Sequence, residues 1–430
     1  MDYESILEDV LKRVKPSKEE EESIRVKADE LISLLRTKFK DVKLLGSVAK
    51  GTFLKGSSDL DVFVFFPKSM SKEEMEERFI DACKDLLKHV ELRYAEHPYV
   101  RVNYKGINAD IVPAYKVSEG EVLSAVDRSP FHTQFILNNL SHEQKDEVRL
   151  LKAFTKGIGI YGAEIKIKGF SGYLLELLIV KYGSFLNTLK KVSKWRKPVR
   201  IFIKEEHKKY LPQFTDLFVV IDPTDPRRNV ASPVSLERLA RFIMGSRSFL
   251  KNPSLEFFFP SKKIESKLYL VGLKLKNVSV VDDVKYGQVL RIERALKNFL
   301  KTNSFDIGNS FICETKDNIY IVFLLTNQRL SEFAIRRGPP IYKEKNVAKF
   351  LSKGIHYFFE EDSILKVVRR QGDILDYIKK FISTYQFPSH FKDTNKDIVS
   401  SFPREIIDCI SKQIYIDYLT IGVVDEGKVH

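Results

Sequence analysis

The sequence predicts a multidomain protein that combines α/β and α+β folds. Its 430 residues are too many for one ordinary core, at about 150 residues per domain. Strand-like apolar runs alternate with helix-like stretches over the first third of the chain, helical periodicity dominates residues 142–190, and short strand-like runs return after residue 255. The domains expected are an α/β domain over 1–140, a helical domain over 141–255 and a C-terminal α/β domain over 256–430.

The first domain is expected to open with helix over residues 3–39, broken at Pro16. Ser17 followed by glutamates is typical of a helix N-terminus, because a serine hydroxyl accepts a hydrogen bond from a free backbone N–H group. The other elements expected are strands at 42–47 and 59–66, a helix over 71–90 capped by Ser71, strands within 92–106 and 108–115, and, in the last domain, strands at 267–276 and 318–326 with a helix over 286–303.

The cysteines and the apolar runs indicate the cellular compartment of the protein. Cys83, Cys313 and Cys409 are far apart and share no metal-ligand spacing. The sequence therefore predicts neither a disulfide framework nor a zinc site, and we expect all three to be small buried side chains. No run of about 18 apolar residues could span a bilayer, and the N-terminus is acidic where a secretory signal would be basic. We expect a cytoplasmic protein without a membrane partner.

The positive charge of the chain is concentrated in its later part. The formal net charge of +14 divides into −4 over residues 1–150 and +18 over residues 151–430. The stretch 190–204 holds seven lysines and arginines together with Trp195 and Phe202. Cations neutralise phosphates and aromatic rings stack on bases, so this composition favours an RNA partner over a merely solubilising surface.

Two aspartates mark the start of the second expected strand. Side chains two residues apart leave a strand on the same face, so Asp59 and Asp61 are expected to project together. Asp110 adds a third acid in the strand expected at 108–115. Neighbouring carboxylates repel one another unless a cation lies between them, and Mg²⁺ binds carboxylates together with substrate phosphates. The three aspartates therefore predict a two-metal site for phosphoryl transfer, in which they are both metal ligands and catalytic residues.

A Gly-Ser pair precedes these aspartates by about a dozen residues. Gly46 permits close backbone approach, and the Ser47 hydroxyl with free N–H groups can hold a polyphosphate. Lys50 adds a positive charge to the same turn. A lone D-x-D is usually a solvated strand end, and most Gly-Ser pairs mark only a turn. The complete order of strand, Gly-Ser turn, D-x-D and later strand aspartate is specific for a nucleotidyltransferase site.

The same spacing resembles the polymerase-β-type nucleotidyltransferase superfamily, and longer strings resemble the archaeal CCA-adding enzymes within it. These strings run through most of the chain in the family's order. They are LLGSVAKGTFLKGSSDLDVFVFF (44–66), LRYAEHPYV (92–100), SAVDRSPFH (124–132), EVRLLKAFTKGIGIYGAEIKIKGFSGYLLELLI (147–179), VIDPTDPRRNVASPVS (220–235) and RRGPP (336–340). The different motifs of the bacterial and eukaryotic class are not found.

The resemblance implies a polymerase-β-like head, a helical neck, and a C-terminal α/β body and tail that bind the acceptor stem and T-arm of tRNA. It also implies template-independent addition of C, C and A to the tRNA 3′ end from CTP and ATP, with release of pyrophosphate. Two Mg²⁺ ions would be held by the three aspartates, one at the triphosphate and one at the attacking 3′-hydroxyl. A homodimer formed through the tail is a further implication.

The nucleotide contacts are also implied by the resemblance. Ser47, Lys50, Lys152 and Tyr161 would line the phosphates and sugar. Lys50 stands where the family often has arginine, and it keeps the charge without the bidentate fork.

Two further nucleotide contacts have alternatives. Thr133 follows PFH, where the family can show a second histidine, and its hydroxyl can still donate to a phosphate. His132 is the alternative for that contact, or a buried structural histidine. Cytosine and adenine share an exocyclic amine and a ring-nitrogen acceptor, and the resemblance assigns their recognition to Arg228, with Arg227 as the alternative.

Two rival functions stay open on the sequence. A poly(A) polymerase or another terminal transferase would use the same three acids, and it would differ by continuing addition beyond C-C-A. A catalytically silent RNA-binding relative would keep the fold. Such a protein has no use for like charges packed beside a Gly-Ser turn, which argues against silence.

Overall fold

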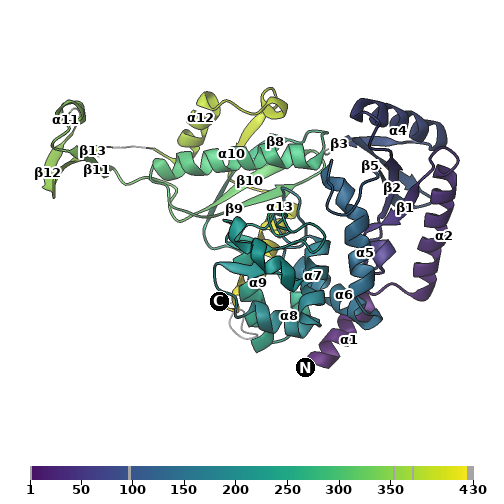
Figure 1. Ribbon diagram of the computed structural model, residues 1–430. Coiled ribbons are helices and arrows are strands. Elements are labelled where there is room, and N and C mark those ends of the chain that lie inside the picture. Colours follow the sequence, from purple (N-terminus) through teal and green to yellow (C-terminus); the bar gives the residue numbers. More distant parts are fainter. Residues whose placement is uncertain (1, 95–97, 352–353, 370–371, 424–430) are drawn as a thin grey trace. The chain divides into compact units, whose positions relative to one another are not determined.

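The computed structural model describes residues 2–94, 98–351, 354–369 and 372–423 (Figure 1). The chain divides into two compact units. The first contains the residues up to Lys262 together with those from Tyr415 onward, and the second contains residues 263–414. Within the described ranges, no helix is both long enough and apolar enough to cross a membrane.

The chain begins with two helices, α1 (Tyr3–Val14) and α2 (Lys18–Leu35). They are separated at Pro16, as the sequence predicts. Ser17 caps α2, because its hydroxyl accepts from the Glu20 N–H while the Glu20 carboxylate accepts from the Ser17 N–H.

A five-stranded sheet forms the centre of the first domain. Its strands are β1 (Val42–Leu45), β2 (Leu60–Phe66), β3 (Glu91–Tyr94), β4 (Pro98–Tyr104) and β5 (Ile107–Tyr115), in the order β1-β2-β5-β4-β3. Only β2 and β5 pair in parallel, and the other neighbours are antiparallel. Residues 95–97, inside the strand region predicted at 92–106, lie outside the described residues.

One face of this sheet is covered by α2 and by α4 (Lys72–Leu86), which Ser71 caps as predicted (Figure 1). Leu60, Val62 and Val64 of β2 point into that core, together with Met75 and Phe79 of α4. The odd-numbered positions of β2 therefore face away from the helices, and Asp61 is one of them.

A helical region follows the sheet in the chain. It contains α5 (Ser129–Asn139), α6 (His142–Gly157), α7 (Gly172–Tyr182), α8 (Phe185–Val192) and α9 (Leu236–Lys251), with a two-stranded parallel pair of β6 (Val199–Ile201) and β7 (Phe218–Val220). Its core is rich in aromatic rings, since Phe154 lies 5.7 Å from both Phe185 and Phe249 between ring centroids.

The second unit contains two sheets. One is built from β8 (Tyr269–Lys276), β9 (Ile307–Glu314), β10 (Asn318–Leu325) and β14 (Lys396–Val399), with helices α10 (Asp282–Thr302) and α12 (Ile374–Thr384), in the strand order β14-β8-β10-β9. The other contains β11 (Phe333–Pro340), β12 (His356–Glu360) and β13 (Ser363–Arg369), in the order β11-β13-β12, with the short helix α11 (Glu344–Phe350). The strands and helix predicted for this region are all present, with small shifts of their ends.

The prediction that no cysteines pair is wrong. Cys313 of β9 forms a disulfide with Cys409 of α13 (Arg404–Ile421) across a Cα–Cα distance of 6.3 Å. The two residues are 96 positions apart and meet because β9 packs against α13, where Phe311 and Ile406 share a cluster. Sequence spacing carries no information about such packing. Cys83 is a free, buried thiol, as expected.

Candidate active site

The three predicted acids come together at one end of the first sheet. Asp61 of β2 is the direct register partner of Asp110 of β5 in their parallel pairing. Asp59 directly precedes β2, which begins at Leu60, one residue later than expected. Because Leu60 and Val62 are buried in the core, Asp61 points to the opposite face of the sheet.

Gly46 makes room for one of these carboxylates. It lies between β1 and Ser47 at a φ of +69°, and β1 pairs with β2 so that Leu45 is opposite Asp61. A Cβ atom at position 46 would lie only 1.8 Å from Oδ2 of Asp61. The glycine is therefore required both by its backbone conformation and by the close approach of the carboxylate. Residues Gly46–Lys50 form the short helix α3 in place of the expected open turn.

The negative charge around Asp61 is only partly balanced by the neighbouring cations. Burial, together with the charges of Asp110 and Asp59, raises the pKa of Asp61 to about 6, against the opposing effects of Lys50 and Arg101. Asp59 and Asp110 have a partner that the sequence analysis missed. Arg101 Nε and Nη2 donate to the two Asp110 oxygens at 2.6 and 2.5 Å, and Nη2 lies 3.2 Å from Asp59 Oδ2.

Arg101 is brought to this position by the strand register. It lies on β4 directly opposite Asp110 of β5. The hydrogen bonds to Asp110 raise the pKa of its guanidinium. An arginine between two apolar residues of β4 can be recognised in the sequence. Only the β4–β5 register shows which acid it contacts.

The three aspartate carboxylates suit a divalent cation, because Mg²⁺ prefers hard oxygen ligands. Across the described ranges, no three His, Cys, Asp or Glu side chains converge closely enough to hold a metal ion as they stand. At this site, Asp59 and Asp110 are paired with Arg101. Asp59, Asp61 and Asp110 are the residues that would hold the ion.

Two of the predicted nucleotide-binding lysines lie in a buried ion cluster beside the acids. Lys50 Nζ donates to Oε2 of Glu176 at 2.5 Å, and Lys152 Nζ lies 3.3 Å from Oε1. Thr52 Oγ1 also donates to Oε1, at 2.6 Å. All four side chains are buried, and Glu176 is completely so. Glu176 was not predicted as a site residue, although it is the only charge in the apolar run 173–180 of α7.

Burial and the neighbouring charges shift the pKa values of this cluster. Burial lowers the pKa of the Lys152 ammonium to about 8, and the Glu176 carboxylate works against that fall. Burial alone would raise the pKa of Glu176, but the charges of Lys50 and Lys152 outweigh it and hold the value at about 2. The carboxylate is therefore ionised and keeps both lysines in place.

Tyr161 lies next to this cluster. A Cβ atom at Gly172 would be 3.3 Å from the Tyr161 hydroxyl and 3.5 Å from Lys152 Cε, so both side chains lie close to this glycine at the start of α7. Burial raises the pKa of Tyr161 to about 12, which keeps its hydroxyl a hydrogen-bond donor. Ser47 is half-buried at the start of α3.

Asp222 organises the predicted base-reading residue. The Asp222 carboxylate lies 2.8 Å from both Nε2 of His132 and Nη1 of Arg228. It also accepts from the Tyr173 hydroxyl at 3.2 Å, and the Tyr173 ring stacks on His132 with centroids 4.0 Å apart. These hydrogen bonds and charges lower the pKa of Asp222 even though it is buried. Lys50 Nζ lies 5.9 Å from the Tyr173 ring centre, which links this cluster to the lysine cluster.

The residues left as alternatives by the sequence, Arg227 to Arg228 and His132 to Thr133, differ in their surroundings. The Arg227 side chain is 66% exposed and is held by Asp225, whereas Arg228 is 34% exposed on the buried Asp222. Thr133 is buried within α5. His132 is half-buried, and burial lowers its pKa.

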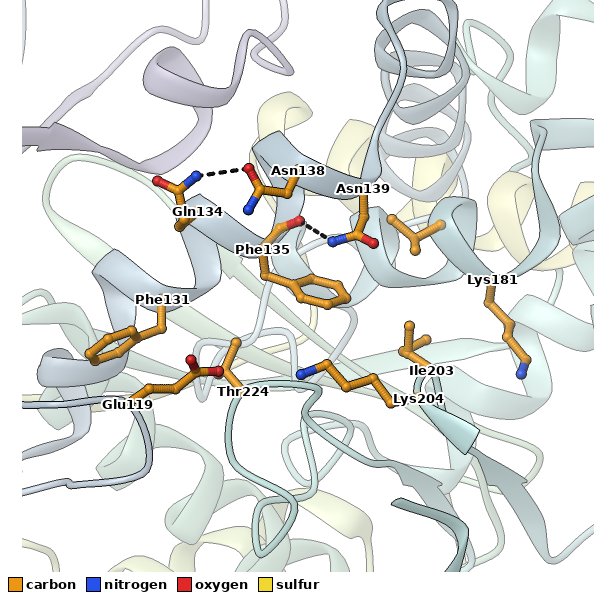
Figure 2. Close-up of a pocket in the computed structure, with 11 residues that line it drawn as sticks. Glu119, Phe131, Gln134, Phe135, Asn138, Asn139, Lys181, Ile203, Lys204 and Thr224 are labelled. Atoms are coloured by element: carbon orange, nitrogen blue, oxygen red, sulfur yellow. Dashed lines mark hydrogen bonds between the residues drawn. The ribbon is translucent and has the colours of Figure 1, made fainter. Parts of the chain in front are cut away.

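A cavity of about 640 Å³ lies beside α5 (Figure 2). Phe131, Gln134 and Phe135 line one side, and Lys204 lies 5.8 Å from the Phe135 ring centre. Thr224, which donates to Asp222, also lines the cavity and so connects it to the side chains around Asp222. The cavity thus combines rings, amides and a cation, the groups that contact single-stranded RNA.

The aromatic residues of the basic stretch 190–204 have different surroundings. Phe202 lies between Lys181 and Lys208, whose ammonium groups are 4.5 and 5.9 Å from its ring centre. Trp195 instead packs against Phe218 and Phe242, at 5.4 and 6.0 Å between centroids. The expectation of an RNA-stacking ring therefore suits Phe202 better than Trp195.

Fold and site together define a nucleotidyltransferase of the polymerase-β-like fold. The nucleotidyltransferase domain model matches residues 28–139, the second domain of tRNA nucleotidyltransferase matches 146–259, and the C-terminal domain of CCA-adding enzymes matches 268–402. The chain belongs to the archaeal CCA-adding enzymes.

The similar proteins cover nearly the whole chain. The CCA-adding enzyme of Sulfurisphaera tokodaii is 42% identical over 392 residues, which are 89% of this chain and 92% of that protein. That of Methanocaldococcus jannaschii is 40% identical over 408 residues, with 88% and 91% covered. Among solved structures, E. coli CdnC with ATP is 19% identical with a TM-score of 0.48, covering 60% of this chain and 95% of that chain.

Proposed function

We propose that this enzyme adds C, C and A to the 3′ end of tRNA from CTP and ATP, without a nucleic-acid template and with release of pyrophosphate. The observation that carries the proposal is the pairing of Asp61 with Asp110 beside Gly46, whose missing side chain leaves space for the Asp61 carboxylate. The family to which the chain belongs supports the choice of tRNA as the substrate.

Each part of the site has a role in this proposal. Two Mg²⁺ ions held by Asp59, Asp61 and Asp110 would supply Lewis-acid stabilisation of the triphosphate and of the attacking hydroxyl. Lys50 and Lys152, held by Glu176, bind phosphate oxygens. Little covalent work falls to the protein, so positioning and charge neutralisation provide most of the acceleration.

The phosphate turn and the sugar contacts complete the nucleotide site. We assign Ser47 to the phosphates, next to the Gly46 backbone, and Tyr161 to the sugar beside Lys152. Thr133 is buried in α5, so His132, stacked on Tyr173, is the better placed of the two for a nucleotide contact.

We also propose a division of labour along the chain. The head over 1–140 carries the acids, the neck over 141–255 carries Lys152, Tyr161 and Arg228, and the body and tail over 256–430 bind the acceptor stem and T-arm. The division is supported by the order of the three family models, whose inner ends lie at residues 139, 146, 259 and 268.

The direct test is incorporation into a tRNA that lacks its 3′ C-C-A. We expect purified protein with Mg²⁺ to add two residues from CTP alone, to add A only after both, and then to stop. Continued addition of A would favour the poly(A) polymerase alternative. Binding of tRNA without any incorporation would favour a silent RNA-binding protein.

Base selection is tested at Arg228. Arg228→Ala is expected to lower the discrimination of CTP against UTP by about one to two powers of ten, because a charged hydrogen bond to the base contributes roughly 1–3 kcal/mol. The measurement is the ratio of kcat/KM for the two nucleotides in single-nucleotide addition. Arg227→Ala is the matched control, since Arg227 binds Asp225 and not Asp222. A ratio that collapses for Arg227→Ala alone would transfer the role to that residue.

RNA binding is tested on the basic stretch 190–204. Replacing the exposed Lys190, Lys194 and Lys197 by Gln should weaken binding equally for different tRNA sequences. It should also reduce the slope of log affinity against log salt by about 1 for each phosphate that is no longer neutralised. Arg200 is kept, because it donates to the carbonyls of Asp216 and Phe214 and supports the local fold.

The control for the tRNA-binding measurement is a second triple variant, made in the acidic first domain. Lys40, Lys84 and Lys88 are three exposed lysines there, and their replacement by Gln makes the same change in total charge. An equal loss of affinity in both triple variants would show a response to net charge only. Affinity that stays constant between about 50 and 200 mM salt would contradict the electrostatic interpretation altogether.

A further inference from the structure

The acidic cluster already contains a cation of its own. Arg101 contacts two of the three carboxylates that would hold a metal, with both Asp110 oxygens and one Asp59 oxygen in range. Asp61 is the third carboxylate, and burial next to the other acids raises its pKa. The hydrogen bonds of the guanidinium are thus directed to two of the three proposed metal ligands, Asp59 and Asp110.

This contact is built into the sheet. Arg101 and Asp110 are direct cross-strand partners on β4 and β5, so their side chains leave the same face of neighbouring strands. The guanidinium is paired with Asp110 through two parallel N–H···O bonds, the strongest geometry for this pair. The side chains are 26% and 17% exposed, so solvent screens the contact only in part.

We propose that Arg101 is a resident counter-ion of the metal site, which a divalent cation must displace from Asp59 and Asp110 in order to bind. The inference rests on the proposed function, since it takes the three aspartates as metal ligands. Without metal, Arg101 keeps the carboxylates from repelling one another. With metal, the same positive charge opposes binding, so Arg101 lowers the intrinsic affinity for the ion.

The test measures metal binding directly, without nucleotide or tRNA. Mg²⁺ is titrated into chelator-treated protein by calorimetry for wild type, Arg101→Gln and Arg101→Lys. We expect Arg101→Gln to bind Mg²⁺ about tenfold more tightly, because an opposing charge is removed from the ligands. Arg101→Lys keeps a charge without the fork and should lie between the two.

Thermal unfolding gives a second readout. In chelator, Arg101→Gln should unfold at a lower temperature than wild type, because the carboxylates lose their counter-ion. The difference should close at saturating Mg²⁺, since the ion then stabilises the folded state. Arg93→Gln is the matched control, because Arg93 makes a similar two-bond interaction on the same sheet, with Glu91 of β3 and not with any of the three acids. It should leave Mg²⁺ affinity at the wild-type value.

The results of the Mg²⁺ titrations distinguish a failure of the role of Arg101 from a failure of the proposed function. Equal or weaker Mg²⁺ binding in Arg101→Gln, with wild type binding normally, overturns the role of Arg101 and leaves the metal site standing. Equal tightening in Arg93→Gln also overturns it, because the effect would then be one of net charge. Wild type that binds no Mg²⁺ while adding C-C-A overturns the assignment of the metal ligands as well.

Discussion

Asp110→Asn is expected to reduce the addition of both C and A by about three powers of ten or more, while tRNA binding stays near the wild-type level. Asp110 faces Asp61 across β2 and β5 and is the acid proposed to serve both ions. The change is nearly isosteric, but it removes one of the charges that stabilise the transferred phosphoryl group, which contribute several kcal/mol. Single-turnover incorporation and filter binding measure the two quantities separately.

Asp41→Asn is the matched control for this substitution. Asp41 precedes β1 of the same sheet and pairs with the exposed Lys116, away from the three acids. We expect its incorporation rate to match wild type. Near wild-type incorporation by Asp110→Asn would contradict the proposed site, and a loss of tRNA binding equal to the loss of rate would point to misfolding instead.

Glu176→Gln is expected to lower the free energy of unfolding by about 3 to 5 kcal/mol, because removing one member of a buried ion cluster leaves uncompensated buried charge. Lys50 and Lys152 would both lose their carboxylate partner. Lys152→Met combined with Glu176→Gln should be less destabilising than Glu176→Gln alone, since it also removes one of the stranded cations. Denaturant unfolding of the three proteins measures this order.

Glu30→Gln is the control for stability, because Glu30 pairs with Lys105 at an exposed position and should contribute little. A similar small effect at Glu176 would show that the cluster does not stabilise the fold. The opposite order, with the double variant the least stable, would show that Lys152 is stabilising in its own right.

Glu176→Gln is also expected to change the pH dependence of kcat/KM, which a purely structural role of the cluster would not produce. The pKa of Lys152 is lowered to about 8, so the ammonium loses its charge as the pH rises through that value. If Lys152 binds phosphate, kcat/KM for nucleotide should fall above about pH 8 in wild type. Glu176 favours the charged form, so in Glu176→Gln the fall should move to lower pH. An unchanged pH profile would separate Lys152 from nucleotide binding.

The elements of the head could be predicted from the sequence because their signals are local. Ser17 and Ser71 cap helices through hydrogen bonds that span only three residues. The alternation in β2 separates Val62 and Val64 in the core from Asp61 on the other face, as a two-residue period requires. Gly46 could be assigned to a close backbone approach, although only the structure shows that the approaching atom belongs to Asp61.

Residue types and their local spacing were thus enough to predict the strands of the head and the face of β2 on which Asp61 lies, and longer strings resembled the family to which the chain belongs. The pairing of charges and of thiols depended instead on the tertiary packing. Arg101 reaches Asp110 through the β4–β5 register, Glu176 reaches Lys50 from 126 positions away, and Cys409 reaches Cys313 across the packing of α13 on β9. Local propensity and periodicity fix a side chain's face and its element, but long-range partners depend on how separate elements pack together. That packing is set by the burial of whole surfaces rather than by any one residue pair.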